Sequence, residues 1–277
     1  MGVALLAGIV PLAGCAPADS RAEARIAESE EARPSPVGPS VVSLNPCADA
    51  ILAEIAPERL AAVSHYSHDP QATSMDVDLA RQFPATGGTV EEVLALGPDV
   101  VVASSFLAPA TRAAFADLGI RVETVGIASS LEESVAQVRS LAEVAQAGPA
   151  GEALAGRMQE RWAEAARVGP QVSAVLWQPG GIVPGDGALV SHMMRQAGFA
   201  SHSAARGLGQ ADYLPLEAML ADPPDLLLVA GRERSQSHPA LEALPEMRVE
   251  RFDPALLYCG GPTIPRALAR LGEVRGK

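Results

Sequence analysis

Short apolar runs alternate with amphipathic stretches along most of the chain. The apolar runs are residues 41–45, 60–64, 99–104, 122–125, 172–177, 225–230 and 249–252. A continuous aliphatic run such as 99–104 is typical of a strand that is buried on both faces. Between the runs lie helical signals, for example Ser130 followed three residues later by Glu133, a capping box for a helix to about residue 146. The alternation predicts parallel, doubly wound sheets.

Residues 149–168 interrupt this alternation with one long helical pattern. Its apolar stripe consists of Leu154, Met158, Trp162 and Ala165. A helix of about 20 residues spans roughly 30 Å, and the following Gly-Pro pair is a stop signal. We therefore expect an α/β protein with two Rossmann-like lobes, each with a parallel sheet. The lobes cover residues 41–147 and 170–277, and one long α-helix at 148–169 joins them.

The first 14 residues have the features of an export signal. The run 1–13 carries no charged side chain, and it is shorter than the roughly 20 apolar residues that span a bilayer. It leads into Leu-Ala-Gly-Cys15, which resembles a bacterial lipobox whose cysteine becomes lipidated. The alternative is a buried N-terminal helix with an ordinary cysteine. Residues 15–40 lack an apolar period and predict a solvated tether, so we expect a lipid-anchored protein in the oxidising periplasm.

One sequence unit occurs in both halves of the chain. Glu91 is followed after seven and eight residues by a proline and an aspartate, and an aliphatic run comes next; Glu217 is followed in the same way. Each glutamate falls in the first turn of a short predicted helix, where the helix dipole favours a carboxylate. Either the two glutamates only stabilise helix starts, or they form a symmetric pair that docks two arginines of a symmetric partner.

The tether, the two lobes, the connecting helix and the repeated unit resemble the substrate-binding proteins of cobalamin and iron–siderophore ABC importers. The resemblance covers about residues 40–272. It implies a monomer whose lobes barely hinge, with a metal chelate (cobalamin, a ferric siderophore or haem) as transported ligand rather than as cofactor. It also implies that Glu91 and Glu217 engage arginines on the two subunits of an inner-membrane permease dimer. Glu92 lies next to Glu91, and the alternative alignment of the motif makes Glu92 the docking glutamate of the N-terminal lobe.

Candidate ligand-binding residues follow the predicted strands, because open α/β sheets bind ligands beyond the carboxyl ends of their strands. They are Tyr66, His68, Phe106, Trp177, Arg232 and Tyr258. The aromatic rings either face a macrocycle or catecholate, or plug the lobe interface. His68 either gives an axial bond to a chelated metal or belongs to a hydrated loop. Arg232 either pairs with ligand carboxylates or is solvated.

Composition and cysteine content narrow the function further. The net charge of −12 argues against a nucleic-acid partner, which needs a basic surface. Three cysteines are too few for a disulfide-dense scaffold. Cys47 and Cys259 fall in strand-to-helix loops of different lobes. They either form a bridge that locks the lobes or remain free, partly buried thiols.

Two other classes of protein are less well supported. A Rossmann-type enzyme would carry a G-x-G-x-x-G motif, a P-loop or a G-x-S-x-G elbow, and the sequence has none of them. A zinc or manganese importer's binding protein would need three or four converging His and carboxylate ligands. The spacing of the five histidines does not indicate such a site. We therefore predict neither catalytic residues nor a resident metal, and favour a binding protein that delivers a chelate.

Overall fold

The N-terminal lobe is built on a parallel sheet whose central strands are largely buried. The computed structural model describes residues 1, 2 and 38–276, so the predicted signal, Cys15 and most of the tether lie outside the described residues. The strands are β1 (Val41–Ser43), β2 (Leu60–Ser64), β3 (Ala85–Thr86), β4 (Val100–Ser104) and β5 (Arg121–Val125). Their order is β3-β2-β1-β4-β5. All pairings in this sheet are parallel, as the aliphatic runs predicted.

Helices follow these strands, and their ends are set by side-chain caps. They are α2 (Pro46–Ile55), α3 (Val77–Ala80), α4 (Val90–Leu96), α5 (Pro109–Asp117) and α6 (Leu131–Val144). The Asn45 side chain accepts hydrogen bonds from the backbone N–H groups of Cys47 and Ala48, which starts α2. Ser130 caps α6 through the N–H of Glu133, at the residue that the sequence predicted.

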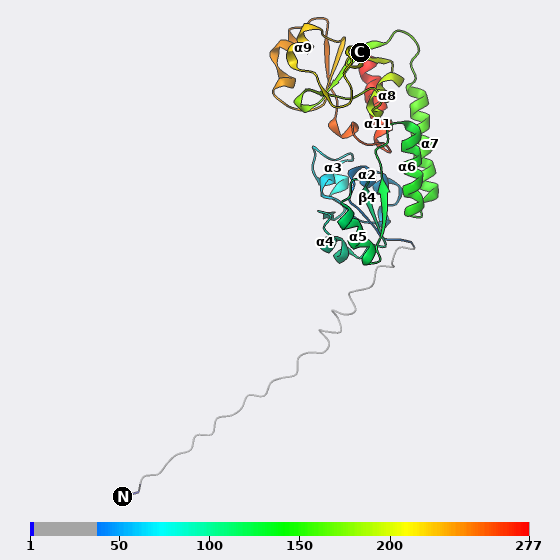
Figure 1. The fold of residues 1–277 in the computed structure, drawn as a ribbon, viewed down its shortest axis with the longest axis vertical. Helices are drawn as coiled ribbons and strands as arrows, with labels where there is room; N and C mark the ends of the chain where they lie inside the picture. Colours follow the sequence, from blue (N-terminus) through cyan, green and yellow to red (C-terminus); the bar gives the residue numbers. More distant parts are fainter. Residues whose placement is uncertain (3–37, 277) are drawn as a thin grey trace. The chain divides into compact units, whose positions relative to one another are not determined.

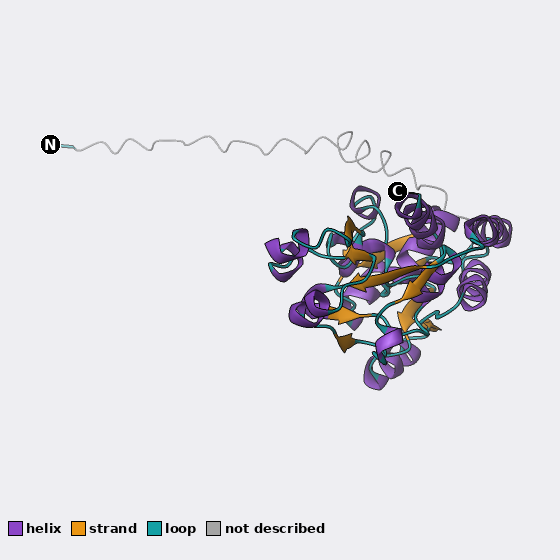
Figure 2. Ribbon diagram, turned by 90° about the horizontal axis from the view of Figure 1, so that it is seen from above, coloured by secondary structure: helices purple, strands orange, loops and turns teal. Residues whose placement is uncertain are grey.

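The C-terminal lobe repeats this layering with a smaller sheet. Its strands are β6 (Val172–Trp177), β8 (Phe199–Ser201), β10 (Leu226–Val229) and β11 (Arg248–Arg251), in the parallel order β11-β10-β6-β8. A separate antiparallel ribbon pairs β7 (Ile182–Val183) with β9 (Asp212–Tyr213). The helices are α8 (Leu189–Gln196), α9 (Leu216–Ala221), α10 (Pro239–Glu242) and α11 (Thr263–Arg275). The two parallel sheets, with helices on both of their sides in Figure 2, confirm the predicted α/β class.

One long helix runs along both lobes. α7 (Gly148–Ala165) packs against α6 and α2 of the N-terminal lobe and against α11 and α8 of the C-terminal lobe (Figure 1). A Cβ atom on Gly151 would come within 2.3 Å of the Ala142 Cβ, so the glycine allows α6 and α7 to approach closely. The helix ends at Ala165, before the Gly-Pro stop signal. Within the described residues, no helix is long and apolar enough to cross a membrane.

The repeated unit has the same local structure in both lobes. Thr89 caps α4, and Pro215 is the residue immediately before α9. Each short helix is followed by a buried proline and then by a buried strand, β4 in one lobe and β10 in the other. The pattern of the sequence therefore predicted two structurally equivalent corners, one in each lobe.

Candidate functional site

The loops that follow the strands of the two lobes meet at a cleft. A cavity of about 120 Å³ at this place is lined by residues of both lobes. The N-terminal lobe contributes Asn45, Cys47, 104–106, 125–128 and Gln137, and the C-terminal lobe contributes Tyr258 and Gly260. The loops after β1, β4 and β5 are thus brought together with the loop before α11. The position agrees with the rule that open α/β sheets bind ligands beyond the carboxyl ends of their strands.

Three of the predicted aromatic residues are exposed at this edge. Phe106 follows β4 and is 80% exposed, Tyr66 follows β2 and is 52% exposed, and Tyr258 precedes α11 and is 55% exposed. Phe106 and Tyr258 line the cavity itself, one from each lobe. Large apolar side chains in water are costly unless a ligand or partner covers them. The cleft therefore offers flat apolar surface from both lobes.

The two tyrosines have different surroundings. The Tyr258 hydroxyl donates to Gln178 Oε1 at 3.1 Å, and partial burial raises the pKa of its phenol above the ordinary value. Tyr66 lies in the 3₁₀ turn η2 (His65–His68), and its ring packs on the His65 ring with the centroids 4.1 Å apart. Tyr258 is thus a neutral hydrogen-bond donor tied to its own lobe, whereas the Tyr66 ring packs on a neighbour of the same turn.

Trp177 does not belong to the cleft surface. Only 1% of it is exposed, and it packs with Val175, Met219 and other core residues of the C-terminal lobe. Its indole Nε1 donates to the carbonyl oxygen of Leu214 at 2.9 Å. The structure thus places Trp177 in the core, because the end of a strand fixes a residue's position along the sheet but not the face to which its side chain points.

His68 is partly buried, and one nitrogen of its ring is held by backbone carbonyl groups. Its Nε2 lies 3.1 Å from the carbonyl oxygen of Ala80 and 3.2 Å from that of Phe83. Because carbonyl oxygens only accept, Nε2 carries the proton in this arrangement, and Nδ1 is the ring nitrogen with a free lone pair. Among the described residues, no three His, Cys, Asp or Glu side chains form a metal-binding group. The zinc or manganese alternative therefore has no candidate site in this part of the chain.

Arg232 lies on an exposed loop after β10, at the carboxyl edge of the C-terminal sheet. The buried Gln236 side chain fixes this loop to β6. Its Nε2 donates to the Trp177 carbonyl oxygen at 2.9 Å, and its Oε1 accepts from the Glu233 N–H at 3.1 Å. The adjacent Glu233 carboxylate is engaged by the N–H of Gly180. Arg232 has no acidic partner in the described residues. Its guanidinium is thus available to an anion.

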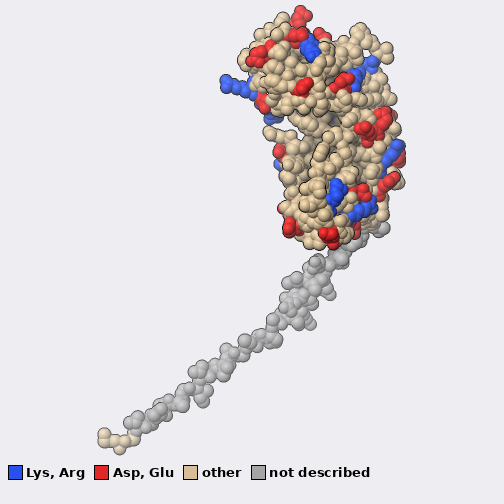
Figure 3. Space-filling model, viewed as in Figure 1, with Lys and Arg blue, Asp and Glu red and all other residues tan. Residues whose placement is uncertain are grey.

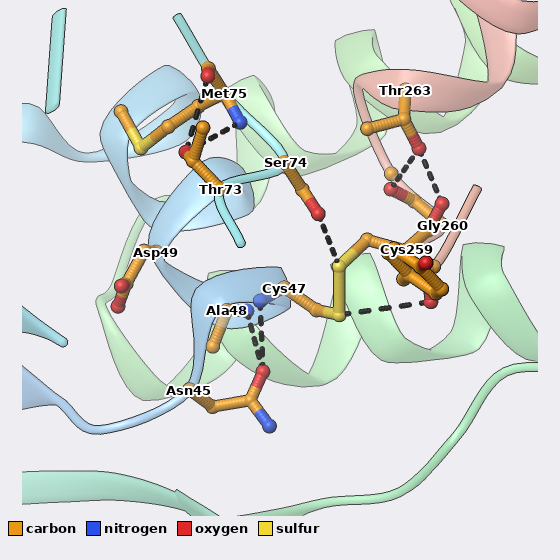
Figure 4. The surroundings of a disulfide bond; sticks show 12 residues. Asn45, Cys47, Ala48, Asp49, Thr73, Ser74, Met75, Cys259, Gly260 and Thr263 are labelled. Atoms are coloured by element: carbon orange, nitrogen blue, oxygen red, sulfur yellow. Dashed lines mark hydrogen bonds between the residues drawn. A yellow bond between two sulfur atoms is a disulfide. The ribbon is translucent and has the colours of Figure 1, made fainter. Parts of the chain in front are cut away.

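The two lobes are joined covalently at the floor of the cleft. Cys47, at the start of α2, and Cys259, just before α11, form a disulfide with a Cα–Cα distance of 5.1 Å (Figure 4). The Ser74 hydroxyl lies 2.8 Å from the Cys259 sulfur. Of the two alternatives that the sequence left open, the structure therefore has the bridge and not the free thiols.

The segment around this disulfide, residues 258–263, is pressed against the N-terminal lobe; we call it the cross-lobe loop. The N–H of Gly261 donates to Ser134 Oγ of α6 at 2.8 Å. A Cβ atom on Gly260 would lie 2.0 Å from Ser134 Oγ, and one on Gly261 would lie 2.6 Å from Ile51 Cγ1. Only glycine permits this approach. The cross-lobe loop is a second connection besides α7, and it carries Tyr258 into the cleft.

Sequence reasoning missed two exposed apolar residues at the carboxyl edges. Ile127 follows β5 and lines the cavity, and Tyr213 ends the β7–β9 ribbon that follows β6. Ile127 could have been found by taking the first two residues after every predicted strand. Tyr213 could not, because the short ribbon strands leave no apolar pattern. Figure 3 shows little charge where the two lobes meet on the drawn face.

The repeated glutamates are both exposed, at the starts of α4 and α9. Glu91 and Glu217 have no hydrogen-bond or ion-pair partner within the described residues. Glu92 differs, because Thr86 Oγ1 donates to its carboxylate at 3.0 Å and this bond lowers the pKa of Glu92 below its ordinary value. Glu92 is thus engaged in a local hydrogen bond, whereas the Glu91 carboxylate has no partner in the described residues. In Figure 1, α4 and α9 lie on the side of the lobes away from α7.

A larger hollow of about 970 Å³ lies away from the strand ends, between α2, α3, α7 and α11. Its lining contains no aromatic residue. Two of its arginines are already paired, Arg157 with Glu54 and Arg161 with Glu164. Size alone would favour this hollow as the ligand site. The exposed aromatic side chains that can bind a planar ligand, however, lie at the cleft.

Comparison with known proteins identifies the architecture. A family model described as periplasmic binding protein matches residues 41–248. The search of curated proteins found no match. Similar solved structures include the periplasmic haem-binding protein RhuT from Roseiflexus sp. RS-1 in apo form, with 22% identity and a TM-score of 0.65 over 86% of this chain and 97% of that chain.

Two structures from Vibrio cholerae are also similar. The periplasmic haem-binding protein HutB has 16% identity and a TM-score of 0.69, over 85% of this chain and 98% of that chain. The periplasmic vitamin B12-binding protein BtuF has 18% identity and a TM-score of 0.66, over 86% of this chain and 98% of that chain. At these identities the likeness establishes the fold alone.

Proposed function

The chain belongs to the periplasmic binding protein family, and from this premise we propose that it captures a metal chelate between its lobes and delivers it to an importer. Family membership makes it a substrate-binding protein of an ABC importer and not an enzyme. The finer proposal concerns the ligand, which we take to be cobalamin, a ferric siderophore or haem. These ligands share a chelated metal, a large partly apolar body and polar or charged groups at its periphery.

One observation carries this proposal: Phe106 and Tyr258 reach one cavity from opposite lobes and remain exposed. Aromatic residues make up only 4% of the sequence, so their gathering at one cleft is not explained by composition. Covering each ring with a planar ligand would remove apolar surface from water, worth about 1–3 kcal/mol per ring. Arg232 would meet an acidic group at the ligand's edge.

The ligands of similar structures point to the same chemical class. RhuT and HutB are described as haem-binding proteins and BtuF as a vitamin B12-binding protein. Each of these ligands is a tetrapyrrole-type macrocycle with a chelated metal. We carry over only this class of ligand, because sequence identities of 16–22% are too low to transfer individual ligand contacts to this chain.

We further propose that the loaded protein docks on a permease dimer through Glu91 and Glu217. Their equivalent corners, their exposure and their lack of partners in the described residues support this role. We propose that the protein works in the periplasm as a monomer, held to the membrane by lipid on Cys15 and by the tether.

A ligand panel tests the proposal. Hemin, hydroxocobalamin, a ferric catecholate, a ferric hydroxamate, Zn²⁺ and NADH are each titrated into the protein by equilibrium dialysis. We expect one chelate to bind at one equivalent with submicromolar affinity, and Phe106→Ala and Tyr258→Ala to weaken it at least tenfold. Leu118→Ala removes an exposed apolar side chain at the opposite edge of the sheet and should leave binding unchanged. Binding of Zn²⁺ or NADH alone would refute the proposal.

A further inference from the structure

Asp49 is a fully buried carboxyl group without a cationic partner. None of its surface is exposed, and none of the ion pairs in the described residues involves it. Its Oδ1 is buried and has no hydrogen-bond partner. Burying a charge without a counter-charge costs several kcal/mol.

The other carboxyl oxygen of Asp49 holds the turn that carries Tyr66. Oδ2 accepts from the backbone N–H of Ser64 at 2.9 Å and from the Ser67 hydroxyl at 2.6 Å. Both serines are buried, and they stand on either side of His65 and Tyr66 in the chain. Ser64 Oγ in turn accepts from the N–H of Tyr66 at 3.4 Å. The exposed turn is therefore fastened from beneath at both ends by one side chain.

The helix that presents Asp49 is itself fixed. Asn45 caps its first turn, and Cys47, two residues before Asp49, is covalently bound to the cross-lobe loop. Figure 4 shows Asp49 on the same helix start as Cys47, with its carboxyl group directed away from the disulfide. The start of α2 thus holds Tyr258 through the disulfide on one side and the Tyr66 turn through the Asp49 carboxyl on the other.

We propose that Asp49 is a positioning residue of the ligand site, whose hydrogen bonds to Ser64 and Ser67 set the orientation of Tyr66 toward the cleft. The role in ligand binding rests on the proposed function, whereas the orientation of Tyr66 is a property of the unliganded protein. A purely structural Asp49 would contribute to stability without selectively affecting Tyr66.

Three variants separate these roles. Asp49→Asn keeps an acceptor oxygen, and Asp49→Leu has similar size without one. Phe115→Leu perturbs a fully buried residue of α5, in a different core cluster, and serves as a stability control. The chain has only three tyrosines, so ring-labelled tyrosine gives three NMR signals, with Tyr66 assigned from Tyr66→Phe. Hemin and hydroxocobalamin serve as binding probes.

We expect Asp49→Leu to shift or broaden the Tyr66 signal while the Tyr213 signal stays in place, and to weaken binding of the active probe at least tenfold. Asp49→Asn should retain both the wild-type Tyr66 signal and the wild-type affinity for the probe. Phe115→Leu should leave the Tyr66 signal unmoved. If Asp49→Leu does not fold, Ser67→Ala removes one of the two bonds and should shift the same signal.

An unchanged Tyr66 signal in Asp49→Leu, or an Asp49→Asn variant as impaired as Asp49→Leu, would overturn the proposal. If neither probe binds the wild-type protein, the proposed function fails for those two chelates. The tyrosine spectrum of the unliganded protein still decides the role of Asp49, so the two failures are distinguishable.

Discussion

Asp99 and Asp225 have the same structural role in the two lobes. The Asp99 carboxylate accepts from the backbone N–H of Ser40 at 2.8 Å, and the Asp225 carboxylate accepts from that of Ser173 at 2.9 Å. Each bond ties the start of a buried strand to the neighbouring strand, β4 to β1 and β10 to β6. The aspartate of the repeated unit is therefore explained by sheet assembly, whereas its glutamate has no partner among the residues that the structure describes.

Asp99→Ala and Asp225→Ala should each lower the free energy of unfolding by about 1 kcal/mol, the ordinary net value of a hydrogen bond. Urea unfolding measures the loss. Asp117→Ala is the matched control, because Asp117 is exposed and its carboxylate has no partner in the described residues. A control that loses as much as the two variants would show that the strand ties contribute nothing.

Seven strands, the connecting helix and the repeated corners could be predicted because each is a local pattern of apolar spacing and caps. The short strands β3, β7, β8 and β9 were not predicted, because two or three residues give no such pattern. The burial of Trp177 and the inward-facing bonds of His68 could not, because both depend on the side to which a side chain turns. The disulfide and the cross-lobe loop could not be decided either, since they depend on how two lobes meet. Asp49 passed unnoticed because an aspartate in the first turn of a helix is ordinary in a sequence.

Removing the disulfide should destabilise the protein markedly. It closes a segment with a sequence separation of 212 residues, and the entropy of so long a loop predicts a loss of about 3–5 kcal/mol for Cys47→Ser with Cys259→Ser. Urea unfolding with and without reductant measures the loss, and the double variant itself should be insensitive to reductant. Hydrogen exchange in the cross-lobe loop should also become faster. Equal stability of the variant and the oxidised wild type would contradict this reasoning.

Glu91→Ala with Glu217→Ala should abolish uptake while ligand affinity stays within about twofold of wild type. The reason is that both carboxylates are exposed, outside the cleft lining, and without partners in the described residues. Uptake in cells and equilibrium dialysis of the purified protein give the two readouts. Glu143→Ala with Glu246→Ala removes the same charge from other exposed positions, one in each lobe, and should transport normally. Normal transport by the Glu91 and Glu217 double variant would exclude docking through this pair.

The burial of Asp49 should make stability depend on pH. Desolvation by burial raises its pKa from 3.8 to about 7, although the hydrogen bonds from Ser67 and Ser64 act in the opposite direction. Between these two values the folded protein holds a proton that the unfolded chain releases, so stability falls as the pH rises from about 4 to about 7 and then levels off. Asp49→Asn cannot ionise and should lack this component.

The free energy of unfolding of Asp49→Asn, relative to that of wild type, should therefore rise by on the order of 4 kcal/mol between pH 4 and pH 8. Urea unfolding of both proteins at intervals across this range gives the difference, in which the titration of all other groups cancels. A difference that stays constant with pH would mean that Asp49 is ionised throughout, with its charge stabilised by a bound cation or by buried water.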